Sequence, residues 1–317
     1  MKVSEILKNT DKTLVSFEIL PPLKGDNIES IYNNLEPLLE FKPPYINITY
    51  HAEEAMYKKH PSGLLEKKAV RKRPGTVAIS AALQYKYNID IIPHIICRGF
   101  TREETENALI DLNFLGINNL LVIRGDADKE TDVFKPEENG HRYAYELIGQ
   151  IMNLNKGIYL DEDIENKTCT NFSVGVAGYP EKHSETPNLR AGIENLKKKI
   201  EIGAEYIVTQ MFFDNAHFFK FVDSCRKNGI TVPIVPGLKP VAIFKHLNII
   251  PQKFAVEIPE QLENEINKCK NNEEVKQVGI EWAIAQSKEL IKSGVPVIHF
   301  FTMGKSDNIV KICQEIF

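Results

Sequence analysis

The strongest constraint on the fold of this chain is a regular alternation of short apolar runs with longer segments of helical periodicity. We interpret the apolar runs as strands, and they lie at residues 14–21, 45–51, 90–99, 118–126, 172–180, 205–213, 231–240 and 295–304. Nearly continuous apolar runs are typical of parallel strands that are covered on both faces. Eight strand-then-helix units predict an α/β fold, a closed (β/α)8 TIM barrel with extra helices, and the alternative is a doubly wound open sheet.

The segments between the strands carry helix signals. We expect helices at 27–40, 75–88, 141–152, 188–203, 215–229, 259–269 and 273–293. A further helix is expected to open at the capping box TREE (101–104) and to stop at Gly116, and a last helix to have Ser306 at its N-cap. KHPSG (59–63) is expected to turn into a polar helix, and 153–171 is interpreted as an inserted loop. Because no Gly-, Ser- or Pro-rich linker divides the chain, we expect one barrel domain over 1–317.

Composition narrows the class of protein. With 43% hydrophobic and 26% charged residues the chain is typical of globular proteins, and its net charge of −4 offers no basic surface for nucleic acid or anionic membranes. No apolar run approaches the roughly 20 residues that span a bilayer. The first twelve residues lack the apolar core of a signal peptide, and the five cysteines form no CxxC pair. We therefore expect a cytoplasmic protein.

Polar residues gather where the predicted strands end. In a barrel these ends form the active-site face, and they carry Glu18, Thr49, His94, Arg124, Asp126, Tyr179, His183, Gln210, Lys239 and Lys305. Each has a structural alternative: Glu18 could pair with a neighbouring Arg or Lys, His94 could be a hydrogen-bonded core residue, and Arg124 and Asp126 could form a salt bridge. Several ionisable groups at different strand ends nevertheless favour a barrel enzyme.

Common cofactor and metal motifs are missing from the sequence. There is no GxGxxG after the first strand, no GxxxxGK[ST] and no HExxH. Glu181, His183 and Glu185 form a weak candidate for a metal site on a loop. We expect no metal.

Taken together and in order, the strand-end motifs resemble the methylenetetrahydrofolate reductase family in its short bacterial form. The motifs are SFEILPP, NITYHA, PHIICRG, LVIRGD, GVAGYPEKH, NLKKKIEIGA, IVTQMFFD, IVPGLKP and IHFFTMG. The resemblance implies a barrel that binds FAD and works by a ping-pong reaction. NADH or NADPH reduces the flavin, which then reduces 5,10-methylenetetrahydrofolate to 5-methyltetrahydrofolate for one-carbon metabolism and methionine biosynthesis. Family members are commonly homo-oligomers.

The resemblance also implies roles for individual residues. Glu18 is the expected general acid, which protonates a bridging nitrogen of the folate, and Asp126 is the expected carboxylate near flavin and pterin. The implied FAD contacts are Thr49, Tyr50, Ala52, His94, Arg124, Gly125, Asp126, Ala144, Tyr179, His183, Asn195 and Lys199. The implied folate contacts are Asp126, Gln210, His246 and Lys305, the last in place of an arginine. Because Glu18 lies at the rim of a cleft, we expect burial to raise its pKa.

Overall fold

Eight parallel strands close into a barrel in the order β1-β10-β9-β8-β7-β6-β5-β2. The structure, a computed structural model, describes residues 1–52, 54–70, 73–127 and 133–317. The barrel strands are β1 (Leu14–Ile19), β2 (Tyr45–Ile48), β5 (Asp90–Ile96), β6 (Asn119–Ile123), β7 (Ser173–Gly178), β8 (Tyr206–Met211), β9 (Ile234–Leu238) and β10 (Val297–Phe301). This closed sheet confirms the barrel and excludes the open alternative.

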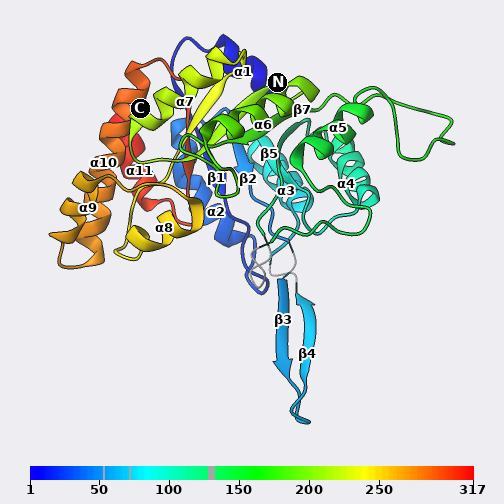
Figure 1. Cartoon of the computed structure of the whole chain (residues 1–317), viewed down its shortest axis with the longest axis horizontal. Coiled ribbons are helices and arrows are strands. Elements are labelled where there is room, and N and C mark those ends of the chain that lie inside the picture. The colour runs from blue at the N-terminus through cyan, green and yellow to red at the C-terminus, as the bar shows by residue number, and fades with distance from the viewer. Residues whose placement is uncertain (53, 71–72, 128–132) are drawn as a thin grey trace.

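Helices surround the barrel (Figure 1). They are α2 (Glu29–Leu35) with the 3-10 helix η1 (Glu36–Phe41), α3 (Thr76–Tyr87), α4 (Arg102–Phe114), α5 (Ala144–Leu154), α6 (Leu189–Ile202), α7 (Asn215–Lys227), α8 (His246–Phe254), α9 (Glu260–Asn267), α10 (Asn272–Lys292) and α11 (Asp307–Ile316). The predicted capping box of α4 is confirmed, because Thr101 Oγ1 accepts from the Glu104 N–H and the Glu104 carboxylate accepts from the Thr101 N–H. Helix α8, which contains Pro251, was not predicted.

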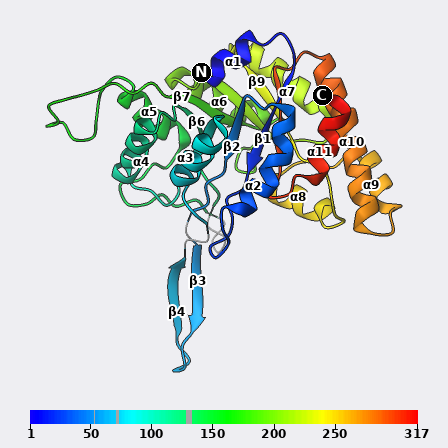
Figure 2. The ribbon, with the colours of Figure 1, turned by 180° about the vertical axis from the view of Figure 1, so that it is seen from behind.

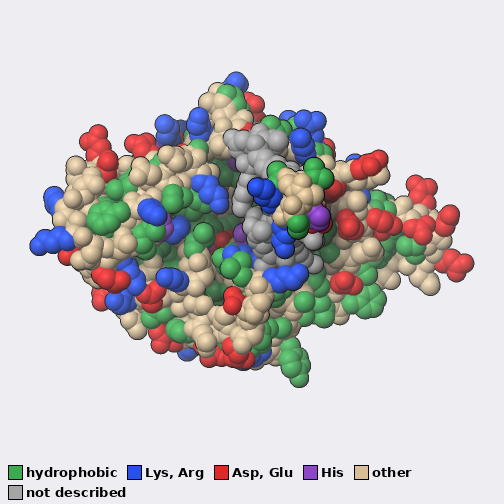
Figure 3. All heavy atoms as spheres, turned by 90° about the horizontal axis from the view of Figure 1, so that it is seen from below, with side chains coloured by type: hydrophobic (Ala, Val, Ile, Leu, Met, Phe, Trp, Pro, Cys, Tyr) green, Lys and Arg blue, Asp and Glu red, His purple; other side chains and the backbone are tan. Residues whose placement is uncertain are grey.

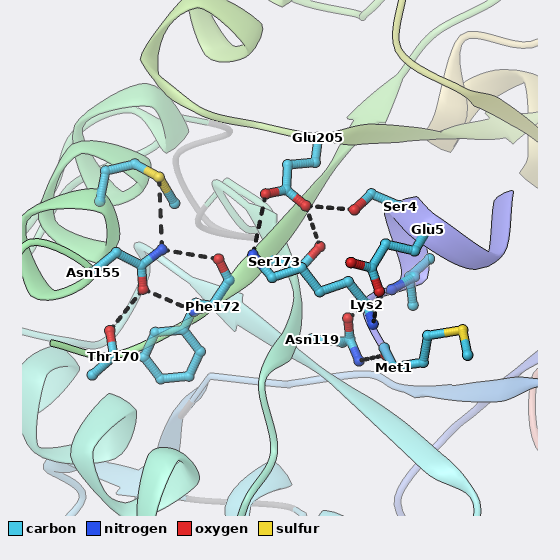
Figure 4. A network of polar contacts seen from close by, with 12 residues as sticks. Met1, Lys2, Ser4, Glu5, Asn119, Asn155, Thr170, Phe172, Ser173 and Glu205 are labelled. Carbon is cyan, nitrogen blue, oxygen red and sulfur yellow. Dashed lines mark hydrogen bonds and ion pairs between the residues drawn. The ribbon is translucent and has the colours of Figure 1, made fainter. Parts of the chain in front are cut away.

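A short N-terminal helix closes one end of the barrel. Val3 and Leu7 of α1 (Val3–Asn9) pack among buried barrel residues such as Tyr206. Hydrogen bonds hold this plug in place (Figure 4): Glu205 accepts from the hydroxyl of Ser4 at 2.6 Å, and it accepts from a second serine, on β7, at the same distance. Helix α1 was not predicted. Because α1 fills the end where the strands begin, an open mouth can form only where they end.

A β-hairpin replaces the polar helix that was expected after KHPSG. Strands β3 (Glu54–Lys59) and β4 (Leu65–Val70) pair antiparallel and project from the barrel (Figures 1 and 2). The predicted turn is right: the His60 N–H donates to the Leu64 carbonyl, and Gly63 has a φ of 85°. The helix prediction is wrong because pairing between the two strands of the hairpin, such as Lys58 opposite Glu66, decides this segment, and its polar composition does not show that pairing.

The segment 155–172 forms a long loop (Figure 1), and that it is an insertion stays a prediction from the sequence. Its ends are tied together by Asn155, which accepts from the Thr170 hydroxyl and the Phe172 N–H. Its middle is tied to α4, since Glu106 accepts from the Leu160 N–H. Within the described residues, no helix is both long and apolar enough to cross a membrane.

Candidate active site

The predicted site residues lie at the carboxyl ends of the barrel strands, opposite the α1 plug. Figure 3 looks onto this face, which is hollowed beside the undescribed residues and carries basic side chains around the hollow. Glu18 lies on β1 and His94 on β5, while Arg124 directly follows β6. Thr302, just after β10, fixes the backbone of Glu18 by donating its hydroxyl to the Glu18 carbonyl at 2.7 Å. The barrel therefore brings residues more than a hundred positions apart to one mouth.

Glu18 is enclosed by imidazoles and has no Arg or Lys ion-pair partner among the described residues. Its Oε2 lies 3.6 Å from His94 Nε2 and 4.0 Å from His299 Nε2, and its side chain is 13% exposed. Burial alone would raise the pKa of Glu18, but His299, His94 and His51 together outweigh burial and hold this pKa below its ordinary value. The expected rise in the pKa of Glu18 is therefore wrong for the protein without substrate. The simple Arg or Lys pair is not seen either.

His94 differs from Glu18 in what burial does to it. Burial lowers the pKa of His94 to about 4, and the nearby Glu18 carboxylate only partly opposes this fall. The Asn47 amide nitrogen lies 3.5 Å from His94 Nε2. His94 is therefore a neutral imidazole near pH 7, which hydrogen-bonds inside the barrel and faces the mouth.

Arg124 and Lys199, together called the cationic corner, form a second part of the site. Arg124 donates from both terminal nitrogens to the Glu185 carboxylate at 2.6 and 2.5 Å. Burial, with the positive charge of Arg124 beside it, lowers the pKa of Lys199 on α6 to about 8. The Arg124 guanidinium also contributes to the lowered pKa of His183, after burial. Two cations held close together at the end of β6 favour an anionic ligand.

Tyr179 and His183 follow β7 and pack edge to face, with ring centroids 4.6 Å apart. Burial raises the pKa of Tyr179 to about 12, so this phenol stays neutral. Gly125 has a φ of 90°, and a Cβ there would lie 3.2 Å from the Cβ of Arg98. The turn after β6 therefore needs glycine, and it places the backbone of Asp126 beside Arg98, which donates to the Asp126 carbonyl at 3.1 Å.

A mostly apolar cavity of about 340 Å³ opens between β5, α3 and α4. Tyr50 and His94 line it together with Phe100, whose ring centroid lies 5.0 Å from that of Tyr50. Thr49 and Ala52 belong to the same connection after β2, and the Thr49 hydroxyl lies 3.3 Å from His51 Nε2. Two of the predicted cofactor contacts, Tyr50 and His94, thus line a cavity that could hold an apolar edge of an aromatic ring.

The remaining predicted residues are less closely joined. Ala144 is the buried first residue of α5, whereas Asn195 on α6 is exposed. Gln210 folds back on its own strand, since its side-chain oxygen accepts from the Met211 N–H. His246 begins α8 and accepts from the Ala242 N–H, and burial lowers its pKa to about 4. Lys305 follows β10 and is exposed.

The two glutamates of the weak metal-site candidate on the loop after β7, Glu181 and Glu185, contact different partners. Glu185 binds Arg124, whereas Glu181 accepts from the Glu257 N–H and lies 3.5 Å from His217. Among the described residues, no three His, Cys, Asp or Glu side chains are grouped to hold a metal ion.

Sequence reasoning missed three contributors to the mouth. His299 lies inside the apolar run of β10, as His94 lies inside that of β5. A histidine within a predicted apolar strand indicated a site residue in both strands, but only His94 was predicted. Ser16 supports His299 from the next strand, with its Oγ 2.8 Å from His299 Nδ1. Glu185 was considered only as a metal ligand, although an arginine partner was equally open.

Comparison with known proteins places this geometry in a family. A family model described as methylenetetrahydrofolate reductase matches residues 2–316. The chain belongs to the methylenetetrahydrofolate reductase family. It is 30% identical over 307 residues to 5,10-methylenetetrahydrofolate reductase from Pectobacterium carotovorum subsp. carotovorum, covering 95% of this chain and 89% of the relative. It is 29% identical over 321 residues to methylenetetrahydrofolate reductase 1 from Schizosaccharomyces pombe, covering all of this chain.

The family also contains longer members. The chain spans 48% of the length of the S. pombe reductase, so it covers about half of that relative. Among solved structures, an uncharacterized Clostridium thermocellum protein, described as binding two copies of 5-methyl-5,6,7,8-tetrahydrofolic acid, has a TM-score of 0.56 and 15% identity. That match covers 99% of this chain and 98% of the other, and it supports the fold alone.

Proposed function

We propose that this methylenetetrahydrofolate reductase family member reduces 5,10-methylenetetrahydrofolate to 5-methyltetrahydrofolate, with FAD as bound cofactor and NADH or NADPH as electron donor. The observation that carries the proposal is the pairing, at one barrel mouth, of a buried carboxyl group with a separate cationic corner. The first suits proton transfer to a substrate, and the second suits the diphosphate of a dinucleotide. Cytoplasmic location, a homo-oligomer and a single domain stay predictions from the sequence.

The residues present fit FAD on structural grounds. Lys199 is a half-buried cation near Arg124, and holding two like charges close together, partly away from solvent, is costly without an anion. Arg124 already shows the two-pronged geometry that a diphosphate needs, with Glu185 in the anionic position. When bound, FAD would accept a hydride from the nicotinamide and deliver one to the folate.

The chain's own residues would prepare the folate. Glu18 would donate a proton to the bridging nitrogen, and the five-membered ring would open to an iminium cation that accepts the hydride. Asp126 is expected to favour that cation by its negative charge. Gln210 and Lys305, with His246, are the proposed contacts to the rest of the substrate.

The test separates the two half-reactions. The purified protein, reconstituted with FAD, is mixed anaerobically with NADH or NADPH, and then the reduced protein with 5,10-methylenetetrahydrofolate, while flavin absorbance is followed. A colourless protein that cannot be reconstituted with FAD would refute the proposal.

Glu18→Gln sharpens this test. Flavin reduction by the nicotinamide should stay within about twofold, because no ring opens in that step. Flavin reoxidation by the folate should slow by about 10²-fold or more, the usual scale for a positioned general acid. Glu106→Gln, which changes a buried glutamate on α4, serves as the matched control and should leave both rates unchanged. Equal losses in both half-reactions of Glu18→Gln would make Glu18 a structural residue.

A further inference from the structure

A lysine at the end of β9 has no role in the proposed reaction. Along this strand, Val235 belongs to the apolar cluster that fills the barrel interior, whereas Ile234 and Leu238 belong to the cluster between the strands and the helices. Successive side chains of a strand alternate between its two faces. Lys239 therefore continues the inward-facing row of Val235 and Gly237, and its side chain faces the mouth.

The register of the barrel gives the height of Lys239 above the core. Strand β10 lies between β9 and β1, and its Phe300 pairs with Leu238. The next residue of β10, Phe301, pairs with Glu18 of β1. Lys239, one residue beyond Leu238, therefore lies at the level of Glu18, two strands away around the barrel. Its ammonium group enters the same mouth as the proposed general acid.

No carboxylate neutralises the Lys239 ammonium. Within the described parts of the chain, this half-buried side chain makes no ion pair and no hydrogen bond, and burial alone lowers its pKa to about 8. Lys239 is therefore still mostly charged at pH 7. Arg124, on the other side of the mouth, is already paired with Glu185. A charge held partly away from water without a counter-ion is costly, so Lys239 is in place for an anion that comes from outside the chain.

His246 supplies a second hydrogen-bond donor beside Lys239. Its Nδ1 accepts from the Ala242 N–H at 3.1 Å, so the proton of the neutral ring is on Nε2. Burial, and after it the charge of Lys239, lower the pKa of His246 to about 4, which keeps this ring neutral. Lys239 and His246, together called the β9 anion site, thus offer N–H donors and one positive charge, and neither has a free acceptor atom.

The β9 anion site is separate from the cationic corner, because β8 and β7 lie between β9 and β6 in the closed barrel. We propose that the β9 anion site binds an oxyanion of the substrate that enters the mouth beside FAD, either a carboxylate of the folate's glutamate or the diphosphate of the nicotinamide nucleotide. Both groups accept hydrogen bonds and carry the negative charge that this site lacks. The identity of these substrates rests on the proposed function, whereas the anion site rests on Lys239 and His246 alone.

The first test measures binding without any reaction. Protein reconstituted with FAD is titrated in a calorimeter with 4-aminobenzoyl-glutamate, which carries the folate carboxylates, and separately with ADP-ribose, which carries the diphosphate of the nicotinamide nucleotide. We expect Lys239→Met to weaken the binding of at least one probe by about tenfold or more, the scale of a hydrogen bond to a charged group. Lys239→Arg, which keeps the charge, should retain most of the wild-type affinity.

Two further variants control this titration. Lys245→Met removes the same charge from an exposed position next to His246, and its affinities should stay within about twofold of wild type. His246→Ala should weaken the same probe by about two- to tenfold, since only a neutral donor is lost.

The pattern of losses in Lys239→Met identifies the oxyanion. A loss for 4-aminobenzoyl-glutamate alone assigns a carboxylate, and a loss for ADP-ribose alone assigns the diphosphate. Losses for both mean that the β9 anion site serves the two substrates in turn. Unchanged affinities in Lys239→Met, or no binding of either probe to wild type, would overturn the inference.

The second test separates binding from a structural role. In stopped-flow half-reactions, Lys239→Met should raise the half-saturating concentration of the affected substrate about tenfold, while the limiting rate stays within about threefold, because the oxyanion lies away from the bond that changes. An equal fall of the limiting rate in both half-reactions, with unchanged half-saturating concentrations, would make Lys239 structural and the inference wrong. A wild type that is never reoxidised by the folate refutes the proposed function, whereas the calorimetric titrations still decide the β9 anion site.

Discussion

The replacement Lys199→Met should stabilise the protein without cofactor and at the same time abolish tight FAD binding. Lys199 lies on α6, partly buried, and burial together with Arg124 lowers its pKa from 10.5 to about 8. The folded protein therefore stores unfavourable free energy in this charge, and methionine keeps the apolar stem while removing it.

The magnitude follows from the pKa. A fall from 10.5 to about 8 corresponds, at about 1.4 kcal/mol for each tenfold change, to at most about 3–4 kcal/mol. Because the side chain keeps some contact with solvent, we expect Lys199→Met to raise the free energy of unfolding by about 1–3 kcal/mol at pH 7.

The pH dependence has a definite sign. The folded pKa lies below the unfolded one, so the penalty is fully present below pH 8. It is relieved as pH rises from about 8 toward 10.5, where the unfolded chain binds a proton that the folded chain does not. The difference in stability between Lys199→Met and wild type should therefore shrink over this range.

Urea denaturation of the FAD-free proteins at several pH values measures this difference, and saturating FAD should reverse the order, because only wild type gains the ligand's binding energy. Lys198→Met, on the exposed neighbouring position of the same helix, is the matched control and should change neither stability nor FAD affinity appreciably. A Lys199→Met protein that is no more stable than wild type and binds FAD equally well would refute the reasoning.

Two further predictions concern packing and the cationic corner. Gly279→Ala on α10 should lower the free energy of unfolding by about 1–3 kcal/mol in urea, because its Cβ would lie 1.8 Å from the Val241 carbonyl oxygen. Gly149→Ala, in an open position inside α5, should instead stabilise by about 0.5–1 kcal/mol, and the same sign for both would contradict the argument. Glu185→Ala should tighten FAD binding up to about fivefold in a fluorescence titration, since Arg124 no longer needs to leave a carboxylate. Weaker binding would mean that Glu185 itself supports the cofactor.

The barrel could be predicted from the sequence because parallel strands covered on both faces must be apolar runs. All eight predicted strands correspond to barrel strands, from β1 to β10. Two helices escaped prediction for physical reasons. Helix α1 has only seven residues, too few to show a helical pattern, and its apolar residues are buried only because they fill the end of the barrel. Helix α8 contains Pro251, and a proline inside a segment normally predicts the end of a helix.

The sequence predicted where the site residues lie, at the ends of the strands, but not how they interact. Arg124, His183 and Lys199 do lie together, as the resemblance implied. The charge state of Glu18 could not be predicted, because it depends on His299, which lies 281 positions away in the chain and becomes a neighbour only when the barrel closes. Sequence patterns report which residues line a strand, but the pKa of a buried group depends on the other strands around it.

The hydrogen bonds that close the barrel have a consequence for biosynthesis. β1 pairs with β10, and Thr302 donates to the carbonyl of Glu18. Glu18 leaves the ribosome 284 positions before Thr302, the residue that donates to its carbonyl. During synthesis, one edge of β1 and one edge of the growing sheet have no strand to pair with. These edges can aggregate or bind a chaperone until β10 has left the exit tunnel. The barrel, and with it the mouth that holds Glu18, is therefore closed only after β10 has been synthesised.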